Sequence, residues 1–341
     1  MRSVFDPELQ FILESRMHPV PNLMRYSEDS EPGISRHRRG QNFYYKLPDG
    51  KTLKAEETLT RIKSLGLPPA YEDVWICIDE FGHLQATGRD SKDRKQYLYR
   101  QDWAQFRATQ KFDKLVDFGN YLPSLRRRVR RDLRQKTATK KFASAALTRL
   151  IDKTSLRIGN QTYADENGSY GATTLQHKHV SYDNGVLAFS FKAKGGKEVN
   201  LTMNDKTLHN TLEEIDSLPG QRLFQYISDN GDICALDSSD VNQYIGDEFS
   251  AKTFRTWRGT VAAFKVAVKD ETPTIKAMSE AAAEDLHNTP TICRSSYIHP
   301  KVIDLTTAKI EDRTKALKEV SGVSKRGLRK YEAQCLAFLE S

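Results

Sequence analysis

The stretch KQYLYRQDWAQFRATQKFDKLV, residues 95–116, joins two parts of the chain that have different patterns. Up to Arg100 the residues alternate as in a strand. From Asp102 the apolar side chains recur at helical spacing, namely Trp103, Phe106, Phe112, Leu115 and Val116. Recurrence at i, i+3 and i+4 is typical of a helix with one apolar face. We therefore predict a boundary here between an N-terminal domain over residues 1–103 and a C-terminal domain over residues 104–341.

Length and composition agree with two domains and favour an anionic partner. The 341 residues are enough for two hydrophobic cores. Lys and Arg exceed Asp and Glu to give a formal charge of +8, which favours a polyanion such as nucleic acid. The four cysteines form no CxxC pair, and no segment is long and apolar enough to span a membrane. We expect a cytoplasmic protein with no membrane partner and no metal site.

The part before residue 104 is predicted to be rich in strands. NFYYKL, residues 42–47, alternates loosely between apolar and polar side chains. The segments DVWICID and HLQATGR, residues 73–79 and 83–89, predict a hairpin with Gly82 in its turn. Residues 59–66 predict a short helix that Gly66 ends.

The part after residue 103 is predicted to be mainly helical. One interruption, residues 173–203, carries strand-like runs joined by DNG and KGGK and predicts a small three-stranded sheet. Helices are expected over residues 238–249, 251–268, 273–286 and 325–340, the last with Leu328, Tyr331, Cys335 and Leu339 on its buried stripe. The fold class is therefore α+β. The basic run 126–141 is interpreted either as a phosphate-binding surface or as a solvated helix face.

The segment NTPTICRSSYIHP, residues 288–300, places Tyr297 after a run rich in hydroxyl groups. A tyrosine that attacks a phosphodiester needs positive groups, because its phenol is a weak nucleophile and the transition state gathers negative charge. Arginine suits this role because its planar fork holds two phosphate oxygens and stays charged. The departing oxygen also needs a proton, which a lysine can supply.

The chain offers candidates for each of these roles. They are Arg157, expected where a helical stretch ends at Gly159; Lys194, at the tip of the predicted hairpin; Arg255, with Lys252 on the same helix face; and Asn288, before Tyr297. Each has an ordinary structural alternative. The charged residues could be solvated surface groups, Asn288 a helix cap and Tyr297 a packed core residue.

Taken in order, the segments LRIGN, KAKGGK, KTFRTW and NTPTICRSSYIHP resemble the active-site segments of type IB DNA topoisomerases, in particular the small bacterial and poxvirus-type enzymes. GISRHRRGQNFYY, PPAYEDVWICID and GHLQATGRDSKDRKQYLYR are similar to the DNA-clamping domain of the bacterial branch. The resemblance runs from about Gly33 to about Pro300. It is the combination that is specific, since any one segment alone would not be.

The resemblance implies that the chain relaxes positive and negative supercoils through a 3′-phosphotyrosyl intermediate, without ATP, metal or other cofactor. It implies that Tyr297 is the nucleophile, that Arg157 and Arg255 clamp the non-bridging oxygens, and that Lys194 is the general acid. It also implies double-stranded DNA as partner, an action as a monomer clamped around it and a place at the nucleoid. The DNA contacts implied are Lys252, Tyr163, Gln96, Tyr97 and Tyr99. Strand alternation agrees in part, because it puts Tyr97 and Tyr99 on one face, although an aromatic contact between strands would explain that pair equally.

One position departs from part of the family. Poxvirus and eukaryotic members have a histidine nine residues before the tyrosine, where this chain has Asn288 beside His287. The bacterial branch has asparagine there, so Asn288 is assigned as a neutral donor to a phosphate oxygen. His287 is set aside because one step along a helix turns a side chain by about 100°.

Two alternatives stay open from the sequence. A tyrosine recombinase or integrase shares the helical catalytic fold and the same order of catalytic residues. Such enzymes generally carry histidine three residues before the second arginine, where this chain has Lys252, and they lack the strand-rich N-terminal part. A nucleic-acid-binding protein without catalytic activity, with Tyr297 simply packed, is the second alternative.

Overall fold

The computed structural model describes residues 24–135 and 138–341, and the side chains of these except 104, 105 and 107–110. The chain divides into two compact units, Met1–Gln110 and Lys111–Ser341. Helix α3, Gln101–Asp132, begins in the first unit and continues into the second. No helix in the described ranges is long and apolar enough to cross a membrane.

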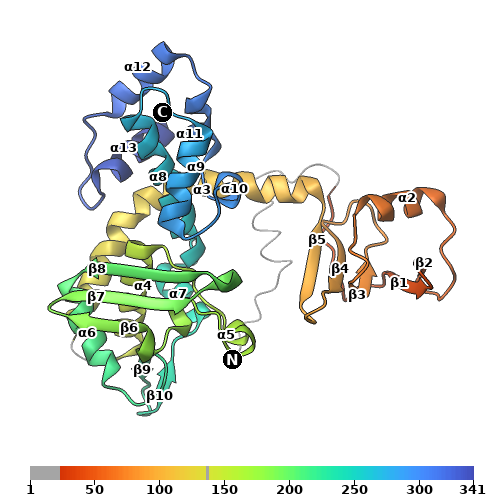
Figure 1. The fold of residues 1–341 in the computed structure, drawn as a ribbon, viewed down its shortest axis with the longest axis horizontal. Coiled ribbons are helices and arrows are strands. Elements are labelled where there is room, and N and C mark those ends of the chain that lie inside the picture. Colours follow the sequence, from red (N-terminus) through yellow and green to blue (C-terminus); the bar gives the residue numbers. More distant parts are fainter. Residues whose placement is uncertain (1–23, 136–137) are drawn as a thin grey trace. The chain divides into compact units, whose positions relative to one another are not determined.

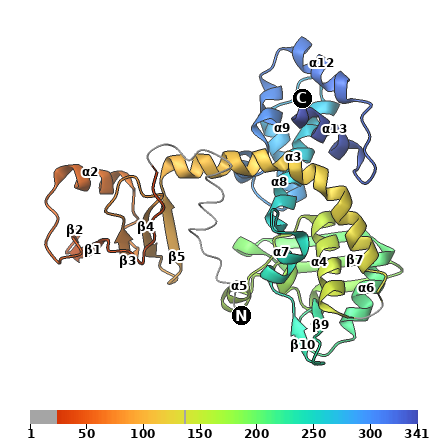
Figure 2. The same ribbon diagram turned by 180° about the vertical axis from the view of Figure 1, so that it is seen from behind.

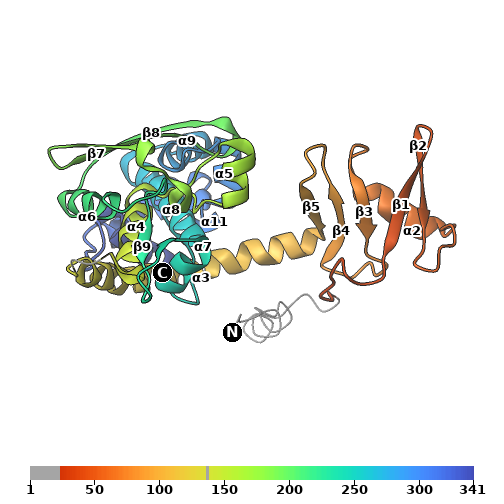
Figure 3. The same ribbon diagram turned by 90° about the horizontal axis from the view of Figure 1, so that it is seen from below.

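The first unit is built on an antiparallel sheet. Its five strands have the order β2-β1-β3-β4-β5, seen side by side in Figure 3. The elements are β1 Ile34–Arg39, β2 Asn42–Lys46, α2 Glu56–Ser64, β3 Glu72–Ile76, β4 Leu84–Arg89 and β5 Lys95–Tyr99. Its small core joins Ile62 of α2 to Ile34, Val74, Ile76 and Ala86 of the sheet. Since β5 pairs with β4 alone, β5 is an edge strand of this sheet.

The second unit is mainly helical and carries a three-stranded antiparallel sheet with the order β6-β7-β8. Helix α4 lies behind this sheet in Figure 1 and in front of it in Figure 2, while α6 packs on β7. A large core surrounds fully buried side chains such as Phe118, Phe142, Phe224 and Phe264. The α-helices are α4 Lys140–Thr154, α5 Gln161–Asn167, α6 Lys206–Asp216, α7 Ser238–Ile245, α8 Ala251–Lys269, α9 Ile275–Leu286, α10 Pro290–Ser296, α11 Pro300–Ile303, α12 Ile310–Val320 and α13 Lys330–Glu340.

The remaining strands and 3₁₀ turns of the second unit are short. The strands are β6 Val180–Asp183, β7 Val186–Lys192, β8 Glu198–Asn204, β9 Gln225–Ile227 and β10 Ile233–Ala235. The 3₁₀ turns are η1 Ala172–Thr174, η2 His177–His179, η3 Lys194–Gly196 and η4 Asp304–Thr306. Strands β9 and β10 form a separate two-stranded ribbon.

The predicted α+β class is confirmed, with a strand-rich N-terminal part and a helical part that contains a three-stranded sheet. Local predictions were wrong at two places in this part of the fold. The sheet is preceded by the 3₁₀ turns η1 and η2 where strand was predicted from residue 173, and the last helix begins at Lys330, so Leu328 lies in the preceding turn. Gly327 explains the later start, because its φ of +95° is one that L side chains rarely adopt and that interrupts a helix.

Candidate active site

Arg157 lies in the loop between α4 and α5. The sequence predicted that the helix would end at Gly159, but α4 ends at Thr154, where Ser155 adopts a left-handed conformation with φ 54°. Asn160 then caps α5 by accepting a hydrogen bond from the backbone N–H of Tyr163. Arg157 therefore projects from a loop rather than from a helix end.

This loop is fixed by close backbone packing. The backbone N–H groups of Ala172 and Thr173 donate to the carbonyls of Arg157 and Ile158, at 2.8 and 2.7 Å. A Cβ at Gly171 would lie 2.6 Å from the Cα of Gly159, so a side chain at Gly171 would separate the two segments. The glycine pair therefore lets η1 hold the backbone of Arg157 in place.

Arg255 is buried on α8, with only 3% of its surface exposed. Its guanidinium donates to the carbonyl of Ser155 and, at 3.0 Å, to the carbonyl of Leu286. These carbonyls stand at the C-terminal ends of α4 and α9, where helix dipoles favour a cation. The alternative interpretation, in which Arg255 and Lys252 lie on a solvated helix face, is thus wrong for Arg255. Lys252, one turn earlier, is exposed.

The two arginines are close enough to repel each other electrostatically. Burial, and next the charge of Arg255, lower the pKa of Arg157 from its usual value. Among the described residues, no carboxylate pairs with either guanidinium, and Arg157 makes no hydrogen bond through its side chain. The Nε of Arg255 is buried without a hydrogen-bond partner there. This concentration of unpaired donors and positive charge is suited to binding an anion.

Tyr297 follows α10 and lies beside this pair. The guanidinium carbon of Arg255 is 5.1 Å from the centre of the Tyr297 ring, and Tyr297 lies near enough to Arg157 for an ionised phenol to raise the pKa of that guanidinium. Its ring is half-buried against the main core. The Tyr297 carbonyl accepts a hydrogen bond from Thr260 at 3.2 Å. A Cβ at Gly259 would lie 2.7 Å from the same oxygen, so only a residue without a side chain allows α8 to approach this closely.

His287 and Asn288 occupy the turn between α9 and α10. His287 ends α9 in a left-handed conformation with φ 48°, so the helical rotation used to set it aside does not apply. Burial is the largest cause that lowers the pKa of His287, and the charge of Arg255 is the second. The charges of Arg157 and Lys197 lower this pKa further. Thr289 caps α10, so Asn288 is not the cap. The Asn288 side-chain amide nitrogen is buried without a partner among the described residues.

Lys194 stands in the turn between β7 and β8, as predicted. It is exposed, and within the described residues its ammonium forms no ion pair or hydrogen bond. A second lysine of this turn, Lys197, acts on the pKa values of both His287 and Cys293. The structure thus brings together Arg157, Arg255, Tyr297 and His287, with Lys197 near them. It does not place Lys194 in contact with this group.

The remaining predicted residues lie on surfaces of the two units. In the second unit, Tyr163 on α5 is 43% exposed. In the first unit, Tyr97 and Tyr99 project from the edge strand β5 with stacked rings whose centres are 6.3 Å apart. Tyr99 also contacts His83, the residue before β4, with ring centres 5.8 Å apart, so the aromatic contact between strands that was left open is present for Tyr99. The amide of Gln96 donates to Asp90 at 3.0 Å, so this group is already engaged.

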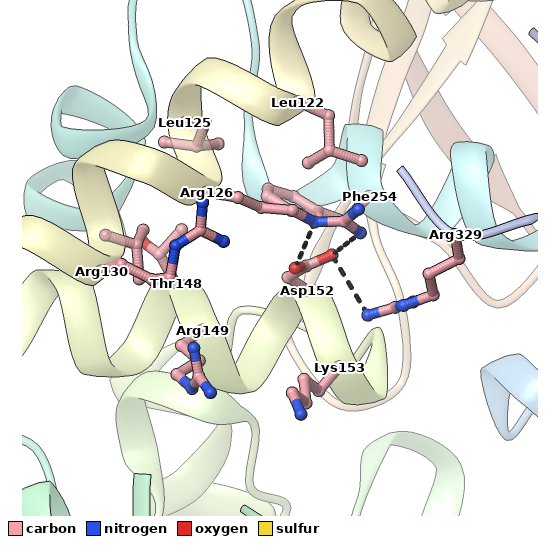
Figure 4. Close-up of a pocket in the computed structure, with 11 residues that line it drawn as sticks. Leu122, Leu125, Arg126, Arg130, Thr148, Arg149, Asp152, Lys153, Phe254 and Arg329 are labelled. Atoms are coloured by element: carbon pink, nitrogen blue, oxygen red, sulfur yellow. Dashed lines mark hydrogen bonds and ion pairs between the residues drawn. The ribbon is translucent and has the colours of Figure 1, made fainter. Parts of the chain in front are cut away.

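Two arginines of the basic run 126–141 are used inside the protein, as Figure 4 shows for the first of them, Arg126. Arg126 bonds Asp152 and Glu332 at 2.7–2.9 Å beside a cavity of about 200 Å³. Arg128 donates to the carbonyls of Tyr244 and Ile245. These two arginines are therefore structural, which neither interpretation of the run anticipated. Arg127, Arg130, Arg131 and Arg134 are exposed, and residues 136 and 137 lie outside the described residues.

The arrangement can place a phenol next to an anion held by two guanidinium groups. Arg157 and Arg255 lie near Tyr297 without a described carboxylate partner, and the amide nitrogen of Asn288 is a further donor without a described partner. Such fixed donors stabilise charge that develops in a transition state. No cluster of metal-ligating side chains occurs within residues 24–135 and 138–341.

Two protein families match this chain, one over each of its two parts. Residues 100–325 match the family described as eukaryotic DNA topoisomerase I, catalytic core. Residues 42–90 match the family described as bacterial DNA topoisomerase IB, N-terminal domain. A solved structure of the site-specific recombinase XerH on DNA covers 69% of this chain and 61% of its own, with 15% identity and a TM-score of 0.35.

Two curated relatives carry the same family name. The DNA topoisomerase 1B of Acanthamoeba polyphaga mimivirus is 32% identical over 292 residues, which cover 80% of this chain and 87% of the viral protein. The DNA topoisomerase 1B of vaccinia virus is 26% identical over 163 residues, 47% of this chain and about half, 51%, of the viral protein. The matched core covers more than half of the chain, and the resemblance found in the sequence is confirmed: the chain belongs to the type IB DNA topoisomerases.

Proposed function

We propose that this enzyme relaxes positive and negative supercoils in double-stranded DNA without ATP or metal. The observation that carries the proposal is the pair Arg157 and Arg255 beside Tyr297, with no described carboxylate to neutralise the two guanidinium groups. A nucleophile next to fixed positive groups is what phosphodiester cleavage by tyrosine requires.

In the proposed cycle, the phenolic oxygen of Tyr297 forms a bond to a backbone phosphorus, and its proton passes to water. The bond from phosphorus to the 5′ oxygen breaks, and Lys194 protonates that oxygen. DNA beyond the nick rotates about the intact strand, and the 5′ hydroxyl then attacks the phosphotyrosine. One phosphodiester is exchanged for another, so the free energy stored in supercoils drives the net change.

The exposure of Lys194 supports its assignment as general acid, because a lysine side chain without a described hydrogen bond or ion pair can follow the leaving oxygen. We also propose that exposed Lys252 and Tyr163, and the stacked pair Tyr97 and Tyr99, contact DNA. Gln96 would first have to exchange its bond to Asp90. The first unit would act as a clamp and the second as the catalytic domain of a monomer working on nucleoid DNA in the cytoplasm.

Plasmid relaxation in EDTA without ATP tests the proposal. Incubation of the full chain with negatively supercoiled plasmid, and separately with positively supercoiled plasmid, is expected to give relaxed topoisomers in both cases. Stopping the reaction with detergent should leave protein attached to the 3′ end of a nicked strand. Relaxation that requires ATP or a divalent cation, or strand exchange between two duplexes without relaxation, would contradict the proposal.

The substitution Asn288→Asp is expected to slow formation of the covalent adduct roughly 10- to 100-fold, because it removes one donor and adds a negative charge beside the phosphate. The Asn288 side-chain oxygen that accepts from Thr289 at 3.0 Å is kept, so the turn should survive. Adduct formation in a single turnover and DNA affinity are the measurements. Asn210→Asp, the same change at an exposed position of α6, is the control. Equal rates for the two variants would remove Asn288 from the site.

A further inference from the structure

Lys111 of α3 forms a contact with the segment that carries the nucleophile. Its ammonium donates to the carbonyl of Ser296 at 2.6 Å, although the two residues are 185 positions apart in the chain. Ser296 immediately precedes Tyr297. Both residues belong to the second unit, so the contact lies within one compact body.

This bond completes the restraint of the backbone around Tyr297. The N–H of Tyr297 donates to the carbonyl of Cys293 at 2.9 Å. The carbonyl of Tyr297 accepts from Thr260 at 3.2 Å. With Lys111 on the Ser296 carbonyl, both polar groups of the Ser296–Tyr297 peptide and the next carbonyl are held by three separate elements. Only the side-chain torsions of Tyr297 then remain to set the position of the phenol.

The surroundings of Lys111 show a half-buried lysine beside the core rather than a fully solvated one. Burial, and next the charge of Lys252 on α8, lower the pKa of Lys111 to about 8. The ammonium also lies 4.2 Å from the ring centre of Phe112. Phe112 in turn packs edge-on against His299, two residues after Tyr297, with ring centres 5.3 Å apart. No described carboxylate pairs with Lys111, so its bonded partner is the Ser296 carbonyl.

We propose that Lys111 is a positioning residue, which fixes the Ser296–Tyr297 peptide so that the phenol of Tyr297 meets the phosphorus in line. This inference rests on the proposed function of Tyr297. Lys111 touches neither substrate nor reacting atoms in this role. Its loss should therefore affect the rate of the chemical step and not the affinity for DNA, because small displacements of a reacting group reduce rate steeply.

Three variants of the full chain test the proposal. Lys111→Met removes the donor and keeps the length of the side chain, whereas Lys111→Arg keeps a charged donor. Lys114→Met is the matched control, one turn further along α3 at a partly exposed position. Each is mixed in excess with supercoiled plasmid at a temperature where circular dichroism shows it folded. The rate of adduct formation, the rate of rejoining and the affinity for plasmid are measured.

Lys111→Met is expected to slow both adduct formation and rejoining roughly 10- to 100-fold at unchanged affinity. Lys111→Arg should recover most of the loss, and Lys114→Met should match the unmodified protein. Unchanged rates in Lys111→Met would overturn the proposal, as would a loss explained by weaker DNA binding or shared by Lys114→Met. If the unmodified protein forms no adduct, the proposed function itself fails. This result differs from the outcomes that would overturn only the role of Lys111.

Discussion

The variant Tyr297→Phe should bind supercoiled plasmid with the affinity of the unmodified protein, form no covalent adduct and relax no DNA. The half-buried ring contacts the core and lies under Arg255, and phenylalanine keeps both contacts. Only the phenolic oxygen is lost, and this atom has no hydrogen bond within the described residues. Removing the proposed nucleophile should leave no other route to a phosphotyrosine, so the expected loss is larger than that for either arginine.

Detergent-trapped adduct, plasmid topoisomers and a filter-binding affinity are measured on the same preparation of Tyr297→Phe. Tyr331→Phe on α13 is a suitable control, because its half-buried ring also lies near a cation, Lys265, at 5.8 Å. The control should relax plasmid normally. An adduct that persists in Tyr297→Phe would show that another residue is the nucleophile and would remove the basis of the mechanism.

The elements that the sequence predicted well are those with strong local patterns. Helices α8 and α9 follow the apolar spacing of residues 251–268 and 273–286 almost to their ends. The hairpin that carries Lys194 follows from two turn signals that flank alternating residues. Where the local signal is weak, the prediction was wrong: Gly159 ends no helix, because its φ of +98° serves a close approach to Gly171, a contact no local pattern reveals.

The site was predictable by residue type but not by environment. The resemblance picked out Arg157, Arg255 and Tyr297, yet nothing in KTFRTW indicates that Arg255 is buried and bonded to the ends of two helices. Lys111 was missed because its partner is a backbone carbonyl, which leaves no signal in side-chain identity. His287 was set aside by assuming a helix, whereas its φ is positive, and burial and the charges of Arg255 and Arg157 lower its pKa.

Arg157 and Arg255 differ in their hydrogen bonds, so substitutions of the two residues should differ in their effect on stability. Arg157→Ala is expected to slow adduct formation on the order of 10²- to 10³-fold, as when one transition-state donor is removed. The Arg157 side chain makes no hydrogen bond within the described residues. Burial and the charge of Arg255 lower its pKa, so in the absence of DNA the charged guanidinium is less favourable in the folded protein than in the unfolded chain. Stability should therefore be kept or slightly increased, which denaturant unfolding can measure.

Arg255→Ala should show a comparable loss of rate together with a loss of stability. Its charged hydrogen bonds to the carbonyls of Ser155 and Leu286 join α4 to α9, and bonds of this kind contribute about 1.5–3 kcal/mol. Arg255→Lys should recover part of the stability but little of the rate, because an ammonium cannot hold two phosphate oxygens in one plane. Equal destabilisation by Arg157→Ala and Arg255→Ala would contradict this division, and normal cleavage by Arg157→Ala would place the phosphate elsewhere. The rates must be compared at a temperature where Arg255→Ala is folded. Only then does the lower rate of adduct formation report on lost phosphate binding rather than on lost hydrogen bonds to the ends of α4 and α9.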